Sequence, residues 1–170
     1  MGDVDLVDEE DEVIGTSDEE AATFNRATIN RGGAVFIFNS KGELLLQKRS
    51  IQKFRYPLHW DSSVGFWVKS GETYDQAAVR EVKEEVGVRI TAADLVKVVH
   101  MKVTTDRTEM YTLFALRHDG PFAINEYEVR EIRSLPPEGV ERMIAAGEKF
   151  SPVFVAAFGK WKELGRPMPK

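Results

Sequence analysis

Three carboxylates stand within five residues of one another in the stretch 80–85, which reads REVKEE. In a helix, at about 100° per residue, Glu81 and Glu85 share one face one turn apart, and Glu84 lies beside them. Clustered carboxylate oxygens are the ligands that a hard divalent cation such as Mg²⁺ prefers. Taken alone, however, the triplet favours an ordinary solvated acidic face, softened by the two basic residues of the stretch. The residues around this stretch distinguish between a metal site and a solvated acidic face.

The residues around this stretch match a longer spacing. The segment resembles the Nudix box, G-x5-E-x7-R-E-U-x-E-E-x-G-U, where U is an aliphatic residue. Phe66 stands at the first glycine of the pattern, directly after Gly65. The resemblance covers roughly residues 30–165 and is closest to the Nudix hydrolases that are similar to isopentenyl diphosphate isomerases. Eight of the nine fixed positions match, namely Glu72, Arg80, Glu81, Val82, Glu84, Glu85, Gly87 and Val88.

This resemblance implies a metal-dependent hydrolase that cleaves the diphosphate linkage of a nucleoside diphosphate derivative or a similar organic diphosphate. The expected cofactor is Mg²⁺, with Mn²⁺ as a substitute. Glu81, Glu84 and Glu85 would hold the metal, and Gly65 would add its backbone carbonyl. A diphosphate is polyanionic, and metal ions neutralise its charge, orient the phosphates and lower the pKa of a bound water.

Catalysis also needs a general base and groups that orient the site. The resemblance gives Glu72 and Arg80 an orienting role, because the two side chains can pair and fix the loop against the helix. Glu85 is one candidate for the base. The other candidates are glutamates of later segments, and the sequence does not choose among them: Glu109, Glu126, Glu128 and Glu131. The expected catalytic set is Glu72, Arg80, Glu81, Glu84 and Glu85.

The departure from the pattern at Phe66 has structural consequences. A glycine at this position permits a positive φ or a close approach of the backbone to a metal, whereas Phe66 would be strained at positive φ. We interpret Phe66 and Trp67 as core aromatics rather than as a stacking platform for a base or an isoprenoid, because large aromatic side chains are usually buried. The departure keeps a catalytically reduced binding module with a Nudix fold as an alternative.

A second alternative belongs to another reaction class. Residues 58–65, LHWDSSVG, resemble the active-site strand of the type I isopentenyl diphosphate isomerase. That enzyme needs a cysteine and a following histidine, and here Gly65 and Trp67 occupy those positions. No histidine precedes His59 to replace the enzyme's N-terminal metal ligands. Because protonation of an alkene needs a strong acid in place, the isomerase is the less favoured alternative.

The elements around the motif must hold it in place. Thr73 as N-cap, Gln76 as the partner in a capping box and Gly87 as a stop predict a helix over residues 73–86. Residues 50–63 are expected to form a loop. The resulting order predicts a Nudix-type α/β/α sandwich around a mixed β-sheet. Strands are expected at 34–38 and 43–49, joined by a turn at 39–42, and at 95–103, 111–116 and 128–135, followed by helices at 137–146 and 152–164.

The N-terminal segment, residues 1–30, is expected to be an acidic lead-in that packs on or flanks a single Nudix domain of residues 31–170. Residues 8–14 could form a short strand pair. Ser17 followed by Glu20 matches a capping box, which predicts a helix over Asp18–Phe24. A flexible acidic tail is the alternative interpretation.

The amino-acid composition limits the kinds of binding partner and chemistry expected of this chain. The chain has 170 residues, a formal net charge of −5 and no cysteine, which excludes disulfides and thiolate chemistry. There is no apolar run near the ~20 residues of a membrane span, and residues 1–12 are acidic, unlike a secretory signal. We therefore expect a cytoplasmic protein that acts on a small-molecule diphosphate, without a membrane or a nucleic acid polymer as partner. A homodimer is compatible with the resemblance.

Histidines and basic residues are two further kinds of side chain that could belong to the site. The three histidines, His59, His100 and His118, are scattered along the chain and do not predict a metal site. Basic residues flank the expected cleft, and our hypothesis is that one or more of them contacts a substrate phosphate. These residues are Lys48, Arg49, Arg55 and Lys69.

Overall fold

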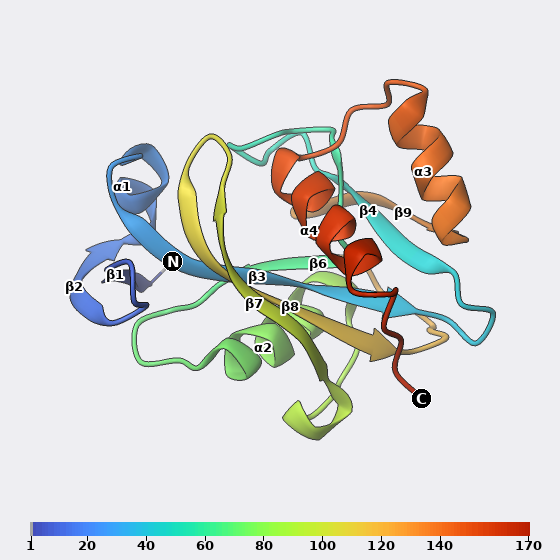
Figure 1. Ribbon diagram of the computed structural model, residues 1–170, viewed down its shortest axis with the longest axis horizontal. Helices are drawn as coiled ribbons and strands as arrows, with labels where there is room; N and C mark the ends of the chain where they lie inside the picture. Colours follow the sequence, from blue (N-terminus) through green and yellow to red (C-terminus); the bar gives the residue numbers. More distant parts are fainter. Residues whose placement is uncertain (1) are drawn as a thin grey trace.

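The computed structural model describes residues 2–170 and contains one mixed sheet with helices on both faces (Figure 1). This arrangement confirms the predicted α/β sandwich around a mixed sheet. None of the helices within residues 2–170 has the length and apolar character needed to cross a membrane. In chain order the elements are β1 (Asp3–Val7), β2 (Val13–Asp18), α1 (Glu19–Phe24), β3 (Ile29–Phe38), β4 (Leu44–Arg49), β5 (Trp60–Asp61), β6 (Val64–Trp67), α2 (Tyr74–Val86), η1 (Ala92–Asp94), β7 (Val96–Thr104), β8 (Thr108–Arg117), β9 (Val129–Leu135), α3 (Pro137–Ala145) and α4 (Pro152–Glu163).

Strand β3 is the centre of the sheet. It pairs in parallel with β8 along its whole length from Asn30 to Phe38, and antiparallel with β1, β4 and β6. Strand β7 continues the sheet beyond β8, and β9 pairs with β4. The hairpin expected at residues 34–49 is present as β3 and β4, although β3 begins at Ile29.

Successive residues of β3 serve two different hydrophobic cores, because side chains alternate between the faces of a strand. Phe36 and Phe38 pack with Trp161 of α4, and the rings of Phe38 and Trp161 stack at 5.3 Å. Val35 and Ile37 face the other way, toward Val82 and the rest of the buried side of α2. In Figure 1, α2 and α4 accordingly lie on opposite faces of the sheet. The acidic face of α2 is left free to line a cavity.

Helix α2 follows the predicted boundaries closely. The Thr73 side chain accepts a hydrogen bond from the Gln76 backbone, and the Gln76 side chain accepts one from the Thr73 backbone, so the predicted capping box is present. Gly87 ends the helix with φ 72°, the left-handed conformation that favours glycine. Local sequence signals therefore fix the position of the whole acidic cluster.

The N-terminal segment is structured, which makes the flexible tail the wrong alternative. The strand pair expected within residues 8–14 is also wrong, because those residues mostly form the turn between β1 and β2. The Asp8 carboxylate accepts hydrogen bonds from the backbone N–H groups of Glu10 and Glu12 and so closes this turn. Helix α1 is present as predicted, but Asp18 rather than Ser17 caps it.

Two short strands were not among the elements expected from the sequence pattern. The loop over residues 50–63 is interrupted by β5, and β6 was not predicted. Phe66 lies on β6 without positive φ, so the expected backbone strain is absent. Its ring fits because Gly33 lies opposite it on β3, where a Cβ atom would stand 2.5 Å from the ring. The core position expected for Phe66 is confirmed, with an exposed fraction of 5%.

Candidate active site

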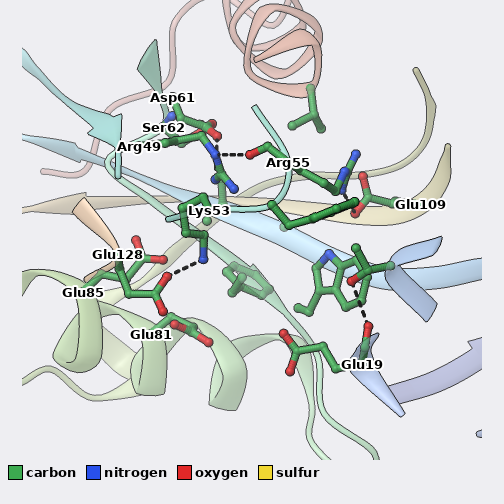
Figure 2. Close-up of a pocket in the computed structure, with 18 of the residues that line it drawn as sticks. Glu19, Arg49, Lys53, Arg55, Asp61, Ser62, Glu81, Glu85, Glu109 and Glu128 are labelled. Carbon is green, nitrogen blue, oxygen red and sulfur yellow. Dashed lines mark hydrogen bonds and ion pairs between the residues drawn. The ribbon is translucent and has the colours of Figure 1, made fainter. Parts of the chain in front are cut away.

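A cavity of about 650 Å³ lies between the acidic face of α2, the end of α1 and the loop after β4 (Figure 2). Strands β3, β6 and β8 contribute to its walls, and Asn125 and Glu128 close it from the segment before β9. This volume is typical of small-molecule sites, which span roughly 300–1,000 Å³. The cavity therefore has room for a ligand much larger than an inorganic diphosphate.

The three glutamates of the motif all line this cavity. Glu85 is the most deeply placed, with an exposed fraction of 6%, whereas Glu84 is exposed. Gln47 of β4 donates a hydrogen bond from Nε2 to Glu85 Oε2 at 2.6 Å, and the same nitrogen donates to the Ser63 carbonyl at 3.2 Å. Gln47 therefore fixes the orientation of the Glu85 carboxylate from strand β4.

The electrostatics of the cluster favour a bound cation. Burial, followed by the negative charge of Glu81, raises the pKa of Glu85 to about 8. Burial also raises the pKa of Glu81, in opposition to the charge of Arg80. Desolvation and like charge both penalise the ionised carboxylates, so a divalent cation at this place would stabilise the form in which both are charged.

Arg80 and Glu72 form the pair that the sequence predicted. Arg80 Nε and Nη2 donate to the two Glu72 oxygens at 2.7 and 2.8 Å, and Nη2 also donates to the Trp67 carbonyl at 3.1 Å. The hydrogen bonds from Arg80 lower the pKa of Glu72, and in turn the pKa of Arg80 is raised. Through its third nitrogen Arg80 also contacts Glu81 and lies 3.5 Å from Glu84. Arg80 thus joins the loop, β6 and the acidic cluster.

We expect Arg80→Ala to destabilise the protein by about 1–3 kcal/mol, because it leaves Glu72 and the Trp67 carbonyl without their charged donor. Thermal unfolding without metal measures the effect. Arg89→Ala removes the same side chain from an exposed position just beyond α2 and should change stability little. Equal melting temperatures of the two variants would show that the Arg80 network does not stabilise the fold.

The four later glutamates that were candidates for the general base differ in their position relative to the cavity. Glu128 lines the cavity near the acidic cluster, and its charge contributes to the raised pKa of both Glu81 and Glu85. Glu126 is exposed outside the cavity lining, and Glu131 pairs with Lys48 at 3.7 Å. Glu109 also lines the cavity, but Figure 2 shows it at the opposite end from Glu81, Glu85 and Glu128.

The segment that carries Glu128 is attached directly to α2. The backbone N–H of Asn125 donates to the Glu85 carbonyl at 2.9 Å, and the N–H of Glu128 donates to the Asn125 carbonyl at 2.9 Å. The N–H of Ser50 donates in turn to the Glu128 carbonyl at 3.0 Å. These bonds hold Glu128 at a defined place near the acidic face of α2.

Three of the four basic residues proposed as phosphate contacts line the cavity. They are Arg49, Arg55 and Lys69, whereas Lys48 lies outside it. Arg49 pairs with Asp61 at 3.2 Å. The histidines are not gathered at the site: none of the three lines the cavity among the described residues.

Trp67 corrects one interpretation of the sequence. It is only half-buried and lines the cavity, so it is not a core aromatic like its neighbour Phe66. Gly65 also lines the cavity, on the strand that faces α2. The alternation of a strand explains the difference, since adjacent side chains point to opposite faces.

The donor set fits a hard divalent cation by its chemistry. Glu81, Glu84 and Glu85 offer carboxylate oxygens in one cavity, and the pKa of Glu85 stays raised although the charge of Lys53 opposes the increase. As the side chains stand, no three acidic or imidazole groups within residues 2–170 converge in the manner of metal ligands. The contacts of Arg80 with Glu81 and Glu84 explain this, because they draw both carboxylates toward the guanidinium.

Two residues of the site were missed by reasoning from the sequence alone. Gln47 is polar within the otherwise apolar start of β4 and is 3% exposed, so the break in the apolar run was a signal for it. Lys53, which pairs with Glu128 inside the cavity, lies in an irregular loop without any such signal.

Comparison with known proteins gives consistent matches. Residues 29–158 match the family model described as NUDIX domain. An uncharacterized Nudix hydrolase of Pseudomonas aeruginosa is 36% identical over 135 residues, which cover 78% of this chain and 77% of that protein. A crystal structure of a Deinococcus radiodurans protein superposes with a TM-score of 0.80 at 30% identity and covers 93% of this chain and 98% of the other. An isopentenyl-diphosphate Delta-isomerase of Salmonella heidelberg is 32% identical over 124 residues, 73% of this chain and 61% of that protein.

Proposed function

We propose that this chain, which belongs to the Nudix family of hydrolases, hydrolyses the diphosphate linkage of a nucleoside diphosphate derivative or a similar organic diphosphate. Nudix hydrolases use divalent metal ions, and the ion we propose here is Mg²⁺, with Mn²⁺ as a substitute. The observation that carries the proposal is the position of Glu85. It is a buried carboxylate, held by Gln47 and placed beside Glu81 in a cavity large enough for an organic diphosphate.

Glu81, Glu84 and Glu85 would hold the cation, together with the Gly65 carbonyl on the facing strand. When bound, the ion would offset the charge of the diphosphate and make an attacking water more acidic. Arg80 positions Glu81 and anchors Glu72, so both act on the loop and the cluster rather than on the substrate. Arg49 and Lys69 contribute positive charge to the cavity wall and would contact phosphate oxygens.

Glu128 is our choice for the general base. It faces the acidic cluster from another element, and its carboxylate, which pairs with Lys53, lies where it can accept a proton from a water in the cavity. Glu85 would be the alternative base. As a metal ligand, however, it would have its lone pairs committed to the cation.

The rival activities receive less support. The cavity wall has Gly65 and Trp67 where the isomerase needs a cysteine and a histidine, and the chain contains no cysteine. A silent binding module would not need the costly burial of Glu85 beside Glu81, which is unfavourable unless a cation is bound.

The direct test is cleavage of the diphosphate bond in a panel of organic diphosphates, followed through the phosphomonoester or phosphate products, with Mg²⁺, with Mn²⁺ and with a chelator. We expect turnover of at least one compound that stops with the chelator and returns with either ion. Binding of the metal without turnover of any compound would favour the silent module, and the conversion of isopentenyl diphosphate without phosphate release would favour the isomerase.

We expect Glu128→Gln to lower kcat by about 10²–10⁴-fold, the usual contribution of a general base. Glu126→Gln and Glu131→Gln change glutamates of the same segment that lie outside the cavity lining, and they should retain activity. An unchanged kcat in Glu128→Gln would transfer the role of base to Glu85.

A further inference from the structure

The end of the cavity opposite the acidic cluster is lined by a carboxylate, an arginine and an indole. Figure 2 shows Glu109 at this end, near Arg55 and far from Glu81, Glu85 and Glu128. Trp67 of β6 completes the wall. Neither a metal site nor a phosphate site requires a buried carboxylate and an indole at this distance from α2.

Glu109 is a buried carboxylate on β8, with an exposed fraction of 4%. Its nearest cation is Arg55, whose Nη1 lies 4.0 Å from Oε1, too far for a hydrogen bond. Desolvation raises the pKa of Glu109, while the charges of Arg55 and Arg107 and a hydrogen bond from Trp67 oppose the increase. An ionised carboxylate in this position needs further hydrogen-bond donors, and a ligand in the cavity can supply them.

The two arginines near Glu109 are held mainly by groups other than its carboxylate. Arg55 Nη2 pairs with Asp106 at 2.8 Å, but its buried Nε lacks a hydrogen-bond partner within residues 2–170. Arg107 donates to Asn30 Oδ1 at 2.7 Å and stacks on Trp67 with 4.6 Å between its guanidinium carbon and the ring centroid. One face of the indole is thus covered, and the remaining surface of Trp67 is what lines the cavity.

Two exposed aromatic side chains border the same cavity. Phe24 at the end of α1 and Phe54 in the loop after β4 meet edge to face, with 4.5 Å between their ring centroids. They are 60% and 67% exposed, which is unusual for phenylalanines that contact each other. Exposed aromatic rings beside a cavity are suited to contact a planar group of a ligand.

We propose that this end of the cavity is a nucleobase subsite, in which Glu109 accepts hydrogen bonds from an amino group and Arg55 donates to a ring carbonyl, with Trp67, Phe24 and Phe54 contacting the ring faces. This inference rests on the proposed function, because it assigns the organic group attached to the diphosphate. Carboxylates pair with base amino groups and arginines with base carbonyls. Guanine and cytosine carry both groups, whereas adenine lacks the carbonyl and uracil lacks the amino group.

A hydrocarbon group fits this end of the cavity poorly. An isoprenoid chain would remove water from Glu109 and Arg55 without replacing the lost hydrogen bonds, which is costly for buried charged groups. A nucleobase replaces those bonds with its own donors and acceptors. The charges at this end therefore favour a nucleoside over an isoprenoid diphosphate.

Binding of nucleoside monophosphates tests the subsite without any need for turnover. With Mg²⁺ present, we expect CMP and GMP to bind about tenfold or more tightly than AMP and UMP, measured by calorimetry. Glu109→Gln should lower the affinity for CMP and GMP by about tenfold. The affinity for ribose 5-phosphate, which has no base, should stay unchanged. Phe54→Ala changes an exposed side chain and should lower the affinity for all four nucleotides alike, by about tenfold. It should leave the affinity for ribose 5-phosphate unchanged.

Glu148→Gln, at an exposed position outside this cavity, is the matched control and should bind every compound as the unmodified protein does. Equal affinity for the four nucleotides and ribose 5-phosphate, or an equal loss for CMP and ribose 5-phosphate in Glu109→Gln, would overturn the subsite. Selective binding of CMP and GMP without hydrolysis of any diphosphate would support the nucleobase subsite and contradict the proposed hydrolase activity. Hydrolysis of dimethylallyl diphosphate without any preference among nucleotides would support the hydrolase activity and contradict the subsite.

Discussion

Glu85→Gln is expected to reduce kcat by about three orders of magnitude with Mg²⁺ present. The amide has the shape of the carboxylate and can still accept the hydrogen bond from Gln47 Nε2. It carries no negative charge, however, and would bind a divalent cation poorly. Steady-state kinetics on the best diphosphate of the panel, at several Mg²⁺ concentrations, measures the loss. An excess of metal should recover little of the activity.

The neighbouring residues supply matched controls for this substitution. Glu84→Gln changes the same side chain one position earlier, where it is exposed, and we expect a loss of about tenfold or less. Gln47→Leu leaves Glu85 in place without its hydrogen bond. Since that bond lowers the pKa of Glu85, the variant should lose metal affinity most strongly at low pH. Similar activity in Glu85→Gln and Glu84→Gln would show that the buried carboxylate has no special role.

The acidic end of the site could be predicted because its geometry is local. Thr73, Gln76 and Gly87 define where α2 begins and ends, and the helical period then places Glu81, Glu84 and Glu85 together. The pairing of Glu72 with Arg80 spans only eight residues and belongs to the same local unit. Hydrophobic patterning likewise sufficed for most strands and for the helices that cover the two faces.

The other end of the site depends on contacts between segments far apart in the chain. Glu109 and Trp67 meet only because β8 and β6 pair with the same strand, β3, on its two sides. The parallel pairing of β3 with β8 has no turn that would reveal its register. The role of Gly33 was hidden for the same reason, since the ring that it accommodates belongs to a strand more than 30 residues later. Residues of this kind were individually visible in the sequence, but their proximity was not.

Stability should depend on pH in a direction set by Glu85. The pKa of this carboxyl is raised from an ordinary value near 4.5 to about 8 in the folded, metal-free protein. Between these values the folded state holds a proton that the unfolded state has released, so the free energy of unfolding falls as pH rises. The loss should be complete just above pH 8, and its size should be on the order of 3–5 kcal/mol. Melting temperatures measured in chelator from pH 5 to pH 9 should therefore fall by about 10 °C.

Two comparisons isolate Glu85 as the cause. Glu85→Gln cannot ionise, so without metal it should melt above the unmodified protein at pH 8 and show a much flatter pH dependence, although the raised pKa of Glu81 leaves a smaller slope. Mg²⁺ should stabilise the unmodified protein more at pH 8 than at pH 5, because metal binding must displace the proton at the lower pH. It should have little effect on Glu85→Gln. A pH dependence that is the same in both proteins would mean that Glu85 is already ionised in the metal-free fold. The low activity and raised stability expected of this one substitution have the same origin, since the buried charge that binds the cation destabilises the fold when the cation is absent.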